Sequence, residues 1–201
     1  RASHVKGEMD GNLAQAIGQG MMLHEVPHEL LEEKIEELKS IEEEKSLLIS
    51  QSGADEIAQE GIIQLANEIN AWKKQEGLQK LSVVLPSGTG TTALYLQATL
   101  DDDITLYTSV LVGDEAYQQK QWKRLSTGPY PKILPSDKKR KFAKPYAEYL
   151  QIHQELESDT GIIFDLIYAP KTWMETVANL SEDEGEILYI HTGGVSGNKT
   201  M

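Results

Sequence analysis

Segments with helical spacing of apolar residues alternate with strand-like segments along most of the chain. In residues 55–76, apolar residues recur every three or four positions, as at Ile62, Leu65 and Ile69, which predicts a long amphipathic helix. Residues 81–85 form a short apolar run of the kind found in buried parallel strands. The same patterns predict helices at 91–99, 115–125, 146–157 and 171–179, and strands at 104–112, 132–134 and 186–191. This alternation predicts the α/β class, with a mainly parallel, twisted sheet that helices cover on both faces.

The first fifty residues follow a less regular pattern. They predict short helices at 13–17 and 29–39 and strands at 21–26 and 46–49. The compact α/β pattern begins after residue 50, so we expect one domain in residues 1–50 and a second in residues 51–201. The chain does not begin with a strand that could open the sheet, and it stops just after a glycine-rich turn. We therefore expect the fold to be incomplete at both ends.

Composition narrows the classes of partner and site. The 39% hydrophobic and 25% charged residues are typical of a globular protein. A net charge of −13 argues against a nucleic-acid partner, because phosphate backbones require a basic surface. No apolar run approaches the roughly 20 residues of a membrane-spanning helix. The absence of cysteine excludes disulfides, thiolate ligands and cysteine nucleophiles, and the histidines lack metal-ligand spacing. We expect a cytoplasmic protein without a metal, a membrane contact or a nucleic-acid partner.

A turn rich in glycine and hydroxyl groups follows the predicted strand at 81–85. The candidate ligand residues in it are Ser87, Gly88, Thr89, Gly90, Thr91 and Thr92. Glycines let backbone N–H groups approach a ligand, and the start of a helix adds unpaired donors. The turn lacks the lysine of a P-loop and the third glycine of a dinucleotide fingerprint. It predicts a neutral cup for a phosphate group. The alternative is a structural turn in which Thr91 caps the following helix.

A second motif ends the predicted strand at 186–191. The sequence His191-Thr192-Gly193-Gly194 places polar side chains where that strand reaches the carboxyl edge of the sheet. Ligands of open α/β sheets bind at this edge. The alternative is an ordinary glycine turn. A second strand-to-glycine turn in the same domain favours the ligand interpretation of both.

Together these motifs resemble the aminocyclopropane-carboxylate deaminase and D-cysteine desulfhydrase family of fold-type-II pyridoxal-phosphate enzymes, whose fold is like that of tryptophan synthase β. The resemblance follows the whole chain in order. It includes Gly11-Asn12-Leu13, Ser52-Gly53-Ala54, the 87–92 turn, Lys144-Pro145-Tyr146, the segment from Thr160-Gly161 to Asp165-Leu166-Ile167-Tyr168, and the His191 motif. It implies that residues 1–50 are the remnant of a small domain and that residues 51–201 belong to the large cofactor-binding domain. It also implies a homodimer for the full-length protein.

The resemblance also implies roles for individual residues. The backbone and hydroxyls of residues 87–92 would hold the phosphate of pyridoxal 5'-phosphate, and Thr192 would approach its pyridine nitrogen. Tyr146 and Tyr168 would face the substrate as acid/base or orienting groups. Ala169 stands where aminocyclopropane-carboxylate deaminases carry an acid that pairs with the ring nitrogen, which argues against ring-opening deamination. The Schiff-base lysine of the family lies upstream of Arg1, and Lys171 is expected to be an exposed residue at a helix start.

The sequence thus predicts a pyridoxal-phosphate-dependent lyase or deaminase. Its substrate would be a small amino acid, of the D-cysteine or the aminocyclopropane-carboxylate kind, converted to an oxo acid and ammonia. We expect these 201 residues alone to be inactive without the upstream lysine. Two alternatives remain open: an α/β module that binds a phosphorylated metabolite without chemistry, and a degenerate homologue that serves only for interaction.

Overall fold

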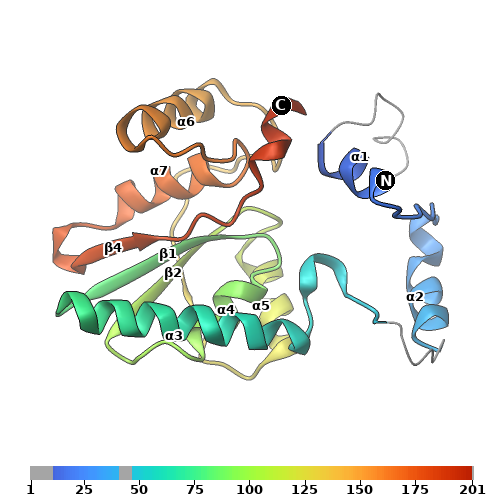
Figure 1. The fold of residues 1–201 in the computed structure, drawn as a ribbon, viewed down its shortest axis with the longest axis horizontal. Coiled ribbons are helices and arrows are strands. Elements are labelled where there is room, and N and C mark those ends of the chain that lie inside the picture. The colour runs from blue at the N-terminus through green and yellow to red at the C-terminus, as the bar shows by residue number, and fades with distance from the viewer. Residues whose placement is uncertain (1–10, 41–46, 201) are drawn as a thin grey trace. The chain divides into compact units, whose positions relative to one another are not determined.

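The computed structural model describes residues 11–40 and 47–200 and divides the chain into two compact units (Figure 1). One unit holds the described residues up to Ile49 together with 196–200, and the other is Ser50–Val195. That the first unit is the remnant of a small domain stays a prediction. Among the described residues, no helix has the length and apolar composition required to cross a membrane.

The first unit is made of short helices joined by irregular chain. Helix α1 spans Gly11–Gly18, and α2 spans Leu31–Lys39 after a 3-10 turn at His28–Leu30. The described part of this unit contains no strand, so the strands predicted at 21–26 and 46–49 were wrong as far as residues 21–26 and 47–49 show; residue 46 lies outside the described residues. The backbone groups of these short apolar runs find no neighbouring strand, and Met22 is 80% exposed.

The second unit is built on four parallel strands in the order β3-β2-β1-β4. The strands are β1 (Leu81–Ser87), β2 (Ile104–Val110), β3 (Lys132–Ile133) and β4 (Glu186–Tyr189). Every residue of β1 is buried, because this strand has a neighbour on each side and helices on both faces. The predicted α/β class with a parallel sheet is confirmed.

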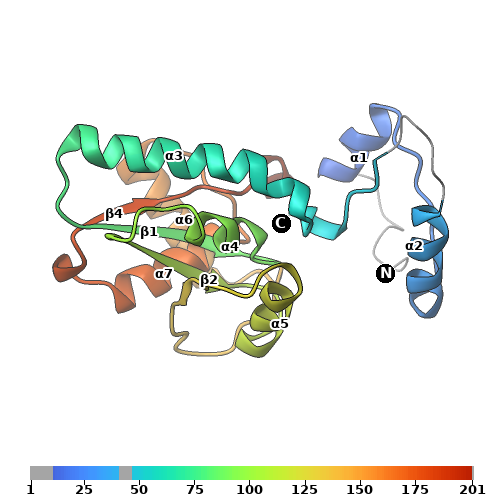
Figure 2. The ribbon, with the colours of Figure 1, turned by 90° about the horizontal axis from the view of Figure 1, so that it is seen from below.

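Helices cover the two faces of the sheet as separate layers (Figures 1 and 2). Helices α3 (Gln59–Glu76), α4 (Thr91–Gln97) and α5 (Glu115–Leu125) lie on one face. Helices α6 (Ala147–Thr160) and α7 (Ala169–Asn179) lie on the other. Leu81, Val83 and Leu85 point into the first layer and Val84 into the second, as the two-residue period of a strand requires. Burial of each leucine contributes about 2 kcal/mol.

The strand order reverses at β1. The chain runs from β1 through β2 to β3 on one side and then returns to add β4 on the other side of β1. In open α/β sheets, ligands bind at such a reversal, outside the carboxyl ends of the strands. The candidate site is therefore expected where β1 and β4 end.

Pro86 ends the pairing of these two strands. The last bond between them is donated by the Ile190 N–H to the Val84 carbonyl, over 2.8 Å. In a parallel ladder the backbone of residue 86 would face β4 next, but proline has no N–H to donate. Pairing with β2 on the opposite side continues to Ser87. The sheet thus separates on the β4 side at the level where the two turns begin.

Candidate functional site

Both predicted motifs leave the same edge of the sheet from neighbouring strands. Val84 pairs with Tyr189, and Ser87 and Thr192 each stand three residues beyond that pair. Neighbouring strands are about 4.8 Å apart, so the two turns begin within the reach of one small ligand. Residues 91 and 92 begin α4, which follows the first turn.

The side chain of Ser87 forms a hydrogen bond between two strands of the sheet. Its Oγ lies 2.5 Å from Thr108 Oγ1, and that hydroxyl donates to the Leu85 carbonyl over 2.8 Å. Ser87 is 2% exposed, and its hydroxyl therefore donates to Thr108 between β1 and β2. The Ser87 hydroxyl is therefore bonded within the sheet, and this bond fixes the residue at the start of the predicted phosphate cup.

The backbone of the following turn presents donors. Within the described chain, no hydrogen bond engages the N–H groups of residues 88–92. The hydroxyls of Thr89 and Thr91 lie 3.1 Å apart at the start of α4. Since buried or half-buried backbone donors are nearly always paired, a row of unpaired N–H groups indicates an outside acceptor. The turn fits an anion that carries several oxygen atoms.

Tyr168 stands beside this turn. A Cβ built on Gly88 would lie 3.8 Å from the Tyr168 hydroxyl oxygen, so the gap between the two is about the size of a methyl group. Burial raises the pKa of Tyr168 above its usual value, and the nearby Asp165 carboxylate raises it further. The phenol is therefore neutral near pH 7 and can donate a hydrogen bond or a proton.

Tyr146 has different neighbours. Its hydroxyl accepts a hydrogen bond from the Lys141 N–H over 3.0 Å, and its ring packs edge-on against Tyr149. The ring that meets Tyr168 edge-on is Phe142, with centroids 5.6 Å apart. The next residue, Ala143, has a φ of 52°, which is uncommon outside glycine. The structure therefore brings Phe142, and not Tyr146, against Tyr168; the substrate-facing role of Tyr146 stays a prediction.

His191 holds the turn after β4. Its ring stacks on Phe164 at 5.0 Å between centroids, its Nδ1 accepts from the Gly193 N–H over 3.2 Å, and its Nε2 lies 3.2 Å from the Ile163 carbonyl. One neutral tautomer satisfies both bonds, with the proton on Nε2. Thr192, between these fixed residues, is exposed and available to a ligand.

Asp165 connects this turn to the start of α7. Its carboxylate accepts from the N–H groups of Ile167, Tyr168 and Ala169, at 3.0, 2.5 and 3.2 Å. A Cβ on Gly193 would overlap the same carboxylate. Asp165 thus caps α7, fixes Tyr168 and packs on the His191 motif. The sequence did signal this cap: an aspartate precedes a helix start that carries a proline in its first turn.

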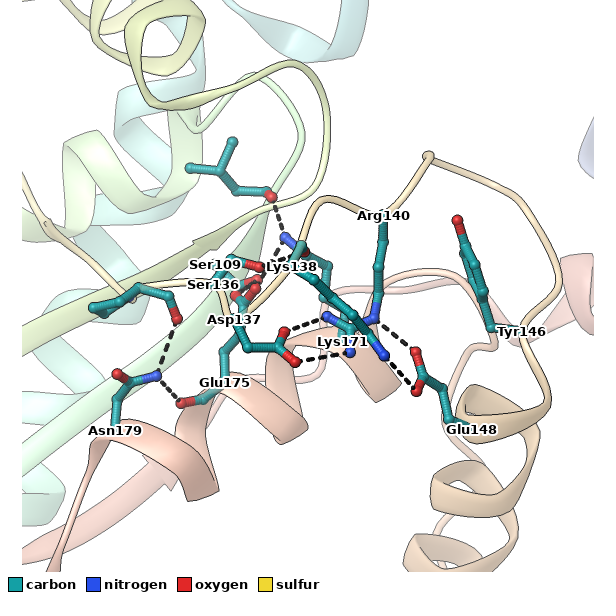
Figure 3. A network of polar contacts seen from close by, with 12 residues as sticks. Ser109, Ser136, Asp137, Lys138, Arg140, Tyr146, Glu148, Lys171, Glu175 and Asn179 are labelled. Atoms are coloured by element: carbon teal, nitrogen blue, oxygen red, sulfur yellow. Dashed lines mark hydrogen bonds and ion pairs between the residues drawn. The ribbon is translucent and has the colours of Figure 1, made fainter.

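A buried polar network attaches α7 to β2 (Figure 3). Lys171 Nζ donates to the Val110 carbonyl over 2.5 Å and lies 3.1 Å from Glu175, and Ser109 donates to Glu175 over 2.5 Å. Lys171 is 9% exposed, so the expectation of an exposed lysine was wrong. Its ammonium is buried because two acceptors, one on its own helix and one at the end of β2, compensate for lost water.

The network extends outward to the loop before α6. Arg140 binds Asp137 and Glu148 at 2.6 and 2.7 Å, which joins that loop to α6. A cavity of about 460 Å³ lies beside these residues at the carboxyl ends of β2 and β3. Its charged lining is largely paired within the protein. In the described residues, no three acidic or histidine side chains gather to hold a metal ion.

The solved structures provide an independent comparison. The crystal structure of an ACC (1-aminocyclopropane-1-carboxylate) deaminase homologue superposes with a TM-score of 0.70 over 96% of this chain, at 24% sequence identity. The chain has the fold of an ACC deaminase homologue. The predicted resemblance is thereby confirmed at the level of the fold. The chain spans 65% of the length of that homologue.

The sequences of known proteins add a shorter match. A protein of Thermotoga maritima, provisionally named 1-aminocyclopropane-1-carboxylate deaminase, is 36% identical over 56 residues, which are 28% of this chain and 18% of that protein. No family model matches the chain. The sequence match and the structural match point to the same group of ACC deaminase homologues.

Proposed function

We propose that the chain binds pyridoxal 5'-phosphate across the carboxyl ends of β1 and β4. One observation carries the proposal: the donor-rich turn at 88–92 and the exposed Thr192 leave adjacent strands at the point where Pro86 ends their pairing. A phosphate monoester supplies the acceptor oxygens that the unpaired N–H groups lack. The similarity of the fold to an ACC deaminase homologue supports the same assignment.

The residues at the other end of the site suit an aromatic ring. Thr192 would offer a hydroxyl toward the ring nitrogen, and Tyr168 would lie beside the phosphate-binding turn. When bound, the cofactor supplies an electron sink for negative charge at the α-carbon of an amino acid. A hydroxyl beside the ring nitrogen limits that sink, which favours elimination of a substituent. Ala169 is buried against Leu156 and Phe164 and offers no acid in its place.

For the full-length protein we propose a lyase or deaminase that converts a small amino acid to an oxo acid and ammonia. The neutral phenol of Tyr168 is the group in this chain best placed to deliver or accept a proton beside the ligand. A thiol amino acid of the D-cysteine kind fits an elimination, and an aminocyclopropane carboxylate remains the alternative. Homodimerisation and a cytoplasmic location are further proposals that follow from the resemblance.

Binding is tested with pyridoxamine 5'-phosphate, which has no aldehyde and cannot react with surface lysines. Calorimetry should give a dissociation constant for this compound that is at least about tenfold below that for pyridoxamine, since only the former carries the phosphate. Glycerol phosphate is the matched control for the ring. Equal binding of glycerol phosphate and pyridoxamine 5'-phosphate would favour the module that holds a phosphorylated metabolite without chemistry.

Activity is tested on the full-length protein by measuring ammonia and sulfide release. D-cysteine, L-cysteine and 1-aminocyclopropane-1-carboxylate are compared at equal concentrations. Sulfide released from one cysteine enantiomer supports the elimination, whereas ammonia from the cyclopropane substrate alone supports ring opening. A protein that binds the cofactor and releases neither product would contradict the proposed enzyme and favour the degenerate homologue.

A further inference from the structure

Two buried side chains of α5 reach the turn after β1. Gln118 Nε2 donates to the Thr89 carbonyl over 2.7 Å, and Trp122 Nε1 donates to the Gly90 carbonyl over 3.0 Å. The two residues stand one helical turn apart, and they are 0% and 1% exposed. They therefore engage two consecutive peptide groups of the turn from the same side.

These bonds, together with the bond that the Leu94 N–H donates to the Gly90 carbonyl over 2.9 Å, set where the opposite ends of the peptide groups point. In a trans peptide the C=O and the following N–H point in opposite directions. With the carbonyls of Thr89 and Gly90 directed at α5, the N–H groups of Gly90 and Thr91 are directed away from it. Neither N–H has a partner in the described chain. The side chains of α5 thus turn two backbone donors toward the open side of the turn.

The backbone at Gly90 is shaped for this contact. Its φ is +74°, in the region that favours glycine, and a Cβ there would overlap Gln118 and lie 2.5 Å from Trp122 Nε1. Trp122 is itself fixed, because its ring stacks on Tyr130 at 5.7 Å between centroids. The turn and the two donors of α5 therefore fit together as one rigid unit.

Packing alone does not explain a glutamine at position 118. Its Oε1 is buried and has no hydrogen-bond partner, which destabilises the folded state. A leucine or methionine would fill similar space without that penalty. The amide is therefore better explained by what its N–H donor does for the Thr89 carbonyl.

We propose that Gln118 and Trp122 are positioning residues that set the affinity of the turn for a phosphate monoester. They act through the direction of the Gly90 and Thr91 N–H groups and touch no ligand. This inference rests on the proposed binding of pyridoxal 5'-phosphate and adds the residues that create its phosphate site. Removal of either donor should weaken binding of the phosphate and spare binding of the ring.

The test compares pyridoxamine 5'-phosphate with pyridoxamine in the full chain and in the variants Gln118→Met and Trp122→Phe. Each variant keeps an apolar side chain at its position and removes one donor. Each should raise the dissociation constant of pyridoxamine 5'-phosphate about tenfold, the effect of one hydrogen bond to a charged group, with the pyridoxamine value nearly unchanged. Gln119→Leu is the control, since the Gln119 side chain on the same helix donates to Glu115 and bonds no residue of the turn.

The outcomes separate the two proposals. If the unaltered chain prefers pyridoxamine 5'-phosphate and both variants keep that preference, the positioning role is overturned and the proposed function stands. If the unaltered chain shows no preference for the phosphate, both are overturned. If one variant unfolds, the amide NMR signals of Gly90 and Thr91 are followed in the other variant while inorganic phosphate is added. Shifts that match those of the unaltered chain contradict the positioning role.

Discussion

The turn after β1 and the turn after β4 reach the same edge of the sheet, but they are held in different ways. The first is fixed through its carbonyls, by Gln118 and Trp122, and so presents backbone N–H groups. The second is fixed through a backbone N–H, which Gly193 donates to His191, and so presents the side chain of Thr192. A row of backbone donors suits an anion, whereas a single exposed hydroxyl suits one directed contact. The contrast explains how one edge can receive a ligand with two chemically different ends.

Lys171 and Glu175 anchor α7 to the end of β2, and loss of this anchor should have the largest effect. Lys171→Met leaves Glu175 buried without its cation, so the free energy of unfolding should fall by roughly 3–5 kcal/mol. Urea unfolding measures this change. The double variant Lys171→Met, Glu175→Leu should recover most of the loss, because no unpaired charge remains. A loss below about 1 kcal/mol for the single variant would show that this pair does not hold α7 on β2.

The two glycines of the first turn should respond differently to alanine. Gly90→Ala forces a Cβ into Gln118 at a positive φ, and should lower the free energy of unfolding by roughly 2–4 kcal/mol. Gly88→Ala meets no atom closer than 3.8 Å and should change it by less than about 0.5 kcal/mol. Thermal or urea unfolding of the pair provides the comparison. Equal effects would mean that α5 does not constrain the turn.

Asp165→Asn should weaken the second turn and leave the first intact. The amide keeps one acceptor for the start of α7 but loses the charge and one acceptor, which should cost about 1–2 kcal/mol. Amide NMR signals of His191 and Gly193 should move, since Gly193 packs on this carboxylate. Signals of Gly88 and Gly90 should stay in place. Equal movement of both groups would contradict the separate support of the two turns.

Tyr168 should give the smallest effect, visible only at alkaline pH. Its pKa is raised in the folded chain, so the folded state holds the phenolic proton more tightly than the unfolded state does. The resulting stability is present below the usual tyrosine pKa of about 10 and is lost as the pH rises through the raised value. Tyr168→Phe should therefore reduce the alkaline loss of stability seen in unfolding curves. An unchanged alkaline slope would contradict the burial of this hydroxyl.

Local sequence was sufficient where a residue's environment is set by its neighbours in the chain. The apolar run at 81–85 and the glycines after it placed β1 and its turn, because a buried strand and a tight turn need those residue types. As far as the described residues show, the strands expected at 21–26 and 46–49 failed because pairing needs a partner strand, which a short apolar run does not supply.

Contacts between distant segments could not be predicted in this way. Gln118 and Trp122 resemble ordinary residues of an amphipathic helix until α5 is seen to lie against the turn, 29 and 32 residues earlier in the chain. Lys171 carries a visible signal, a glutamate four residues later, but its burial depends on the end of β2. Phe142 gave no signal, because only the fold places its ring against Tyr168.

The central claim is that one ligand spans both turns, with its phosphate on the first and its ring on the second. Amide NMR of the ¹⁵N-labelled chain during titration with pyridoxamine 5'-phosphate tests it most directly. Signals of residues 88–92 and 192–194 should shift together along one binding curve, and inorganic phosphate should shift only the first group. Separate binding curves for the two groups, or no shift in residues 88–92, would contradict the claim.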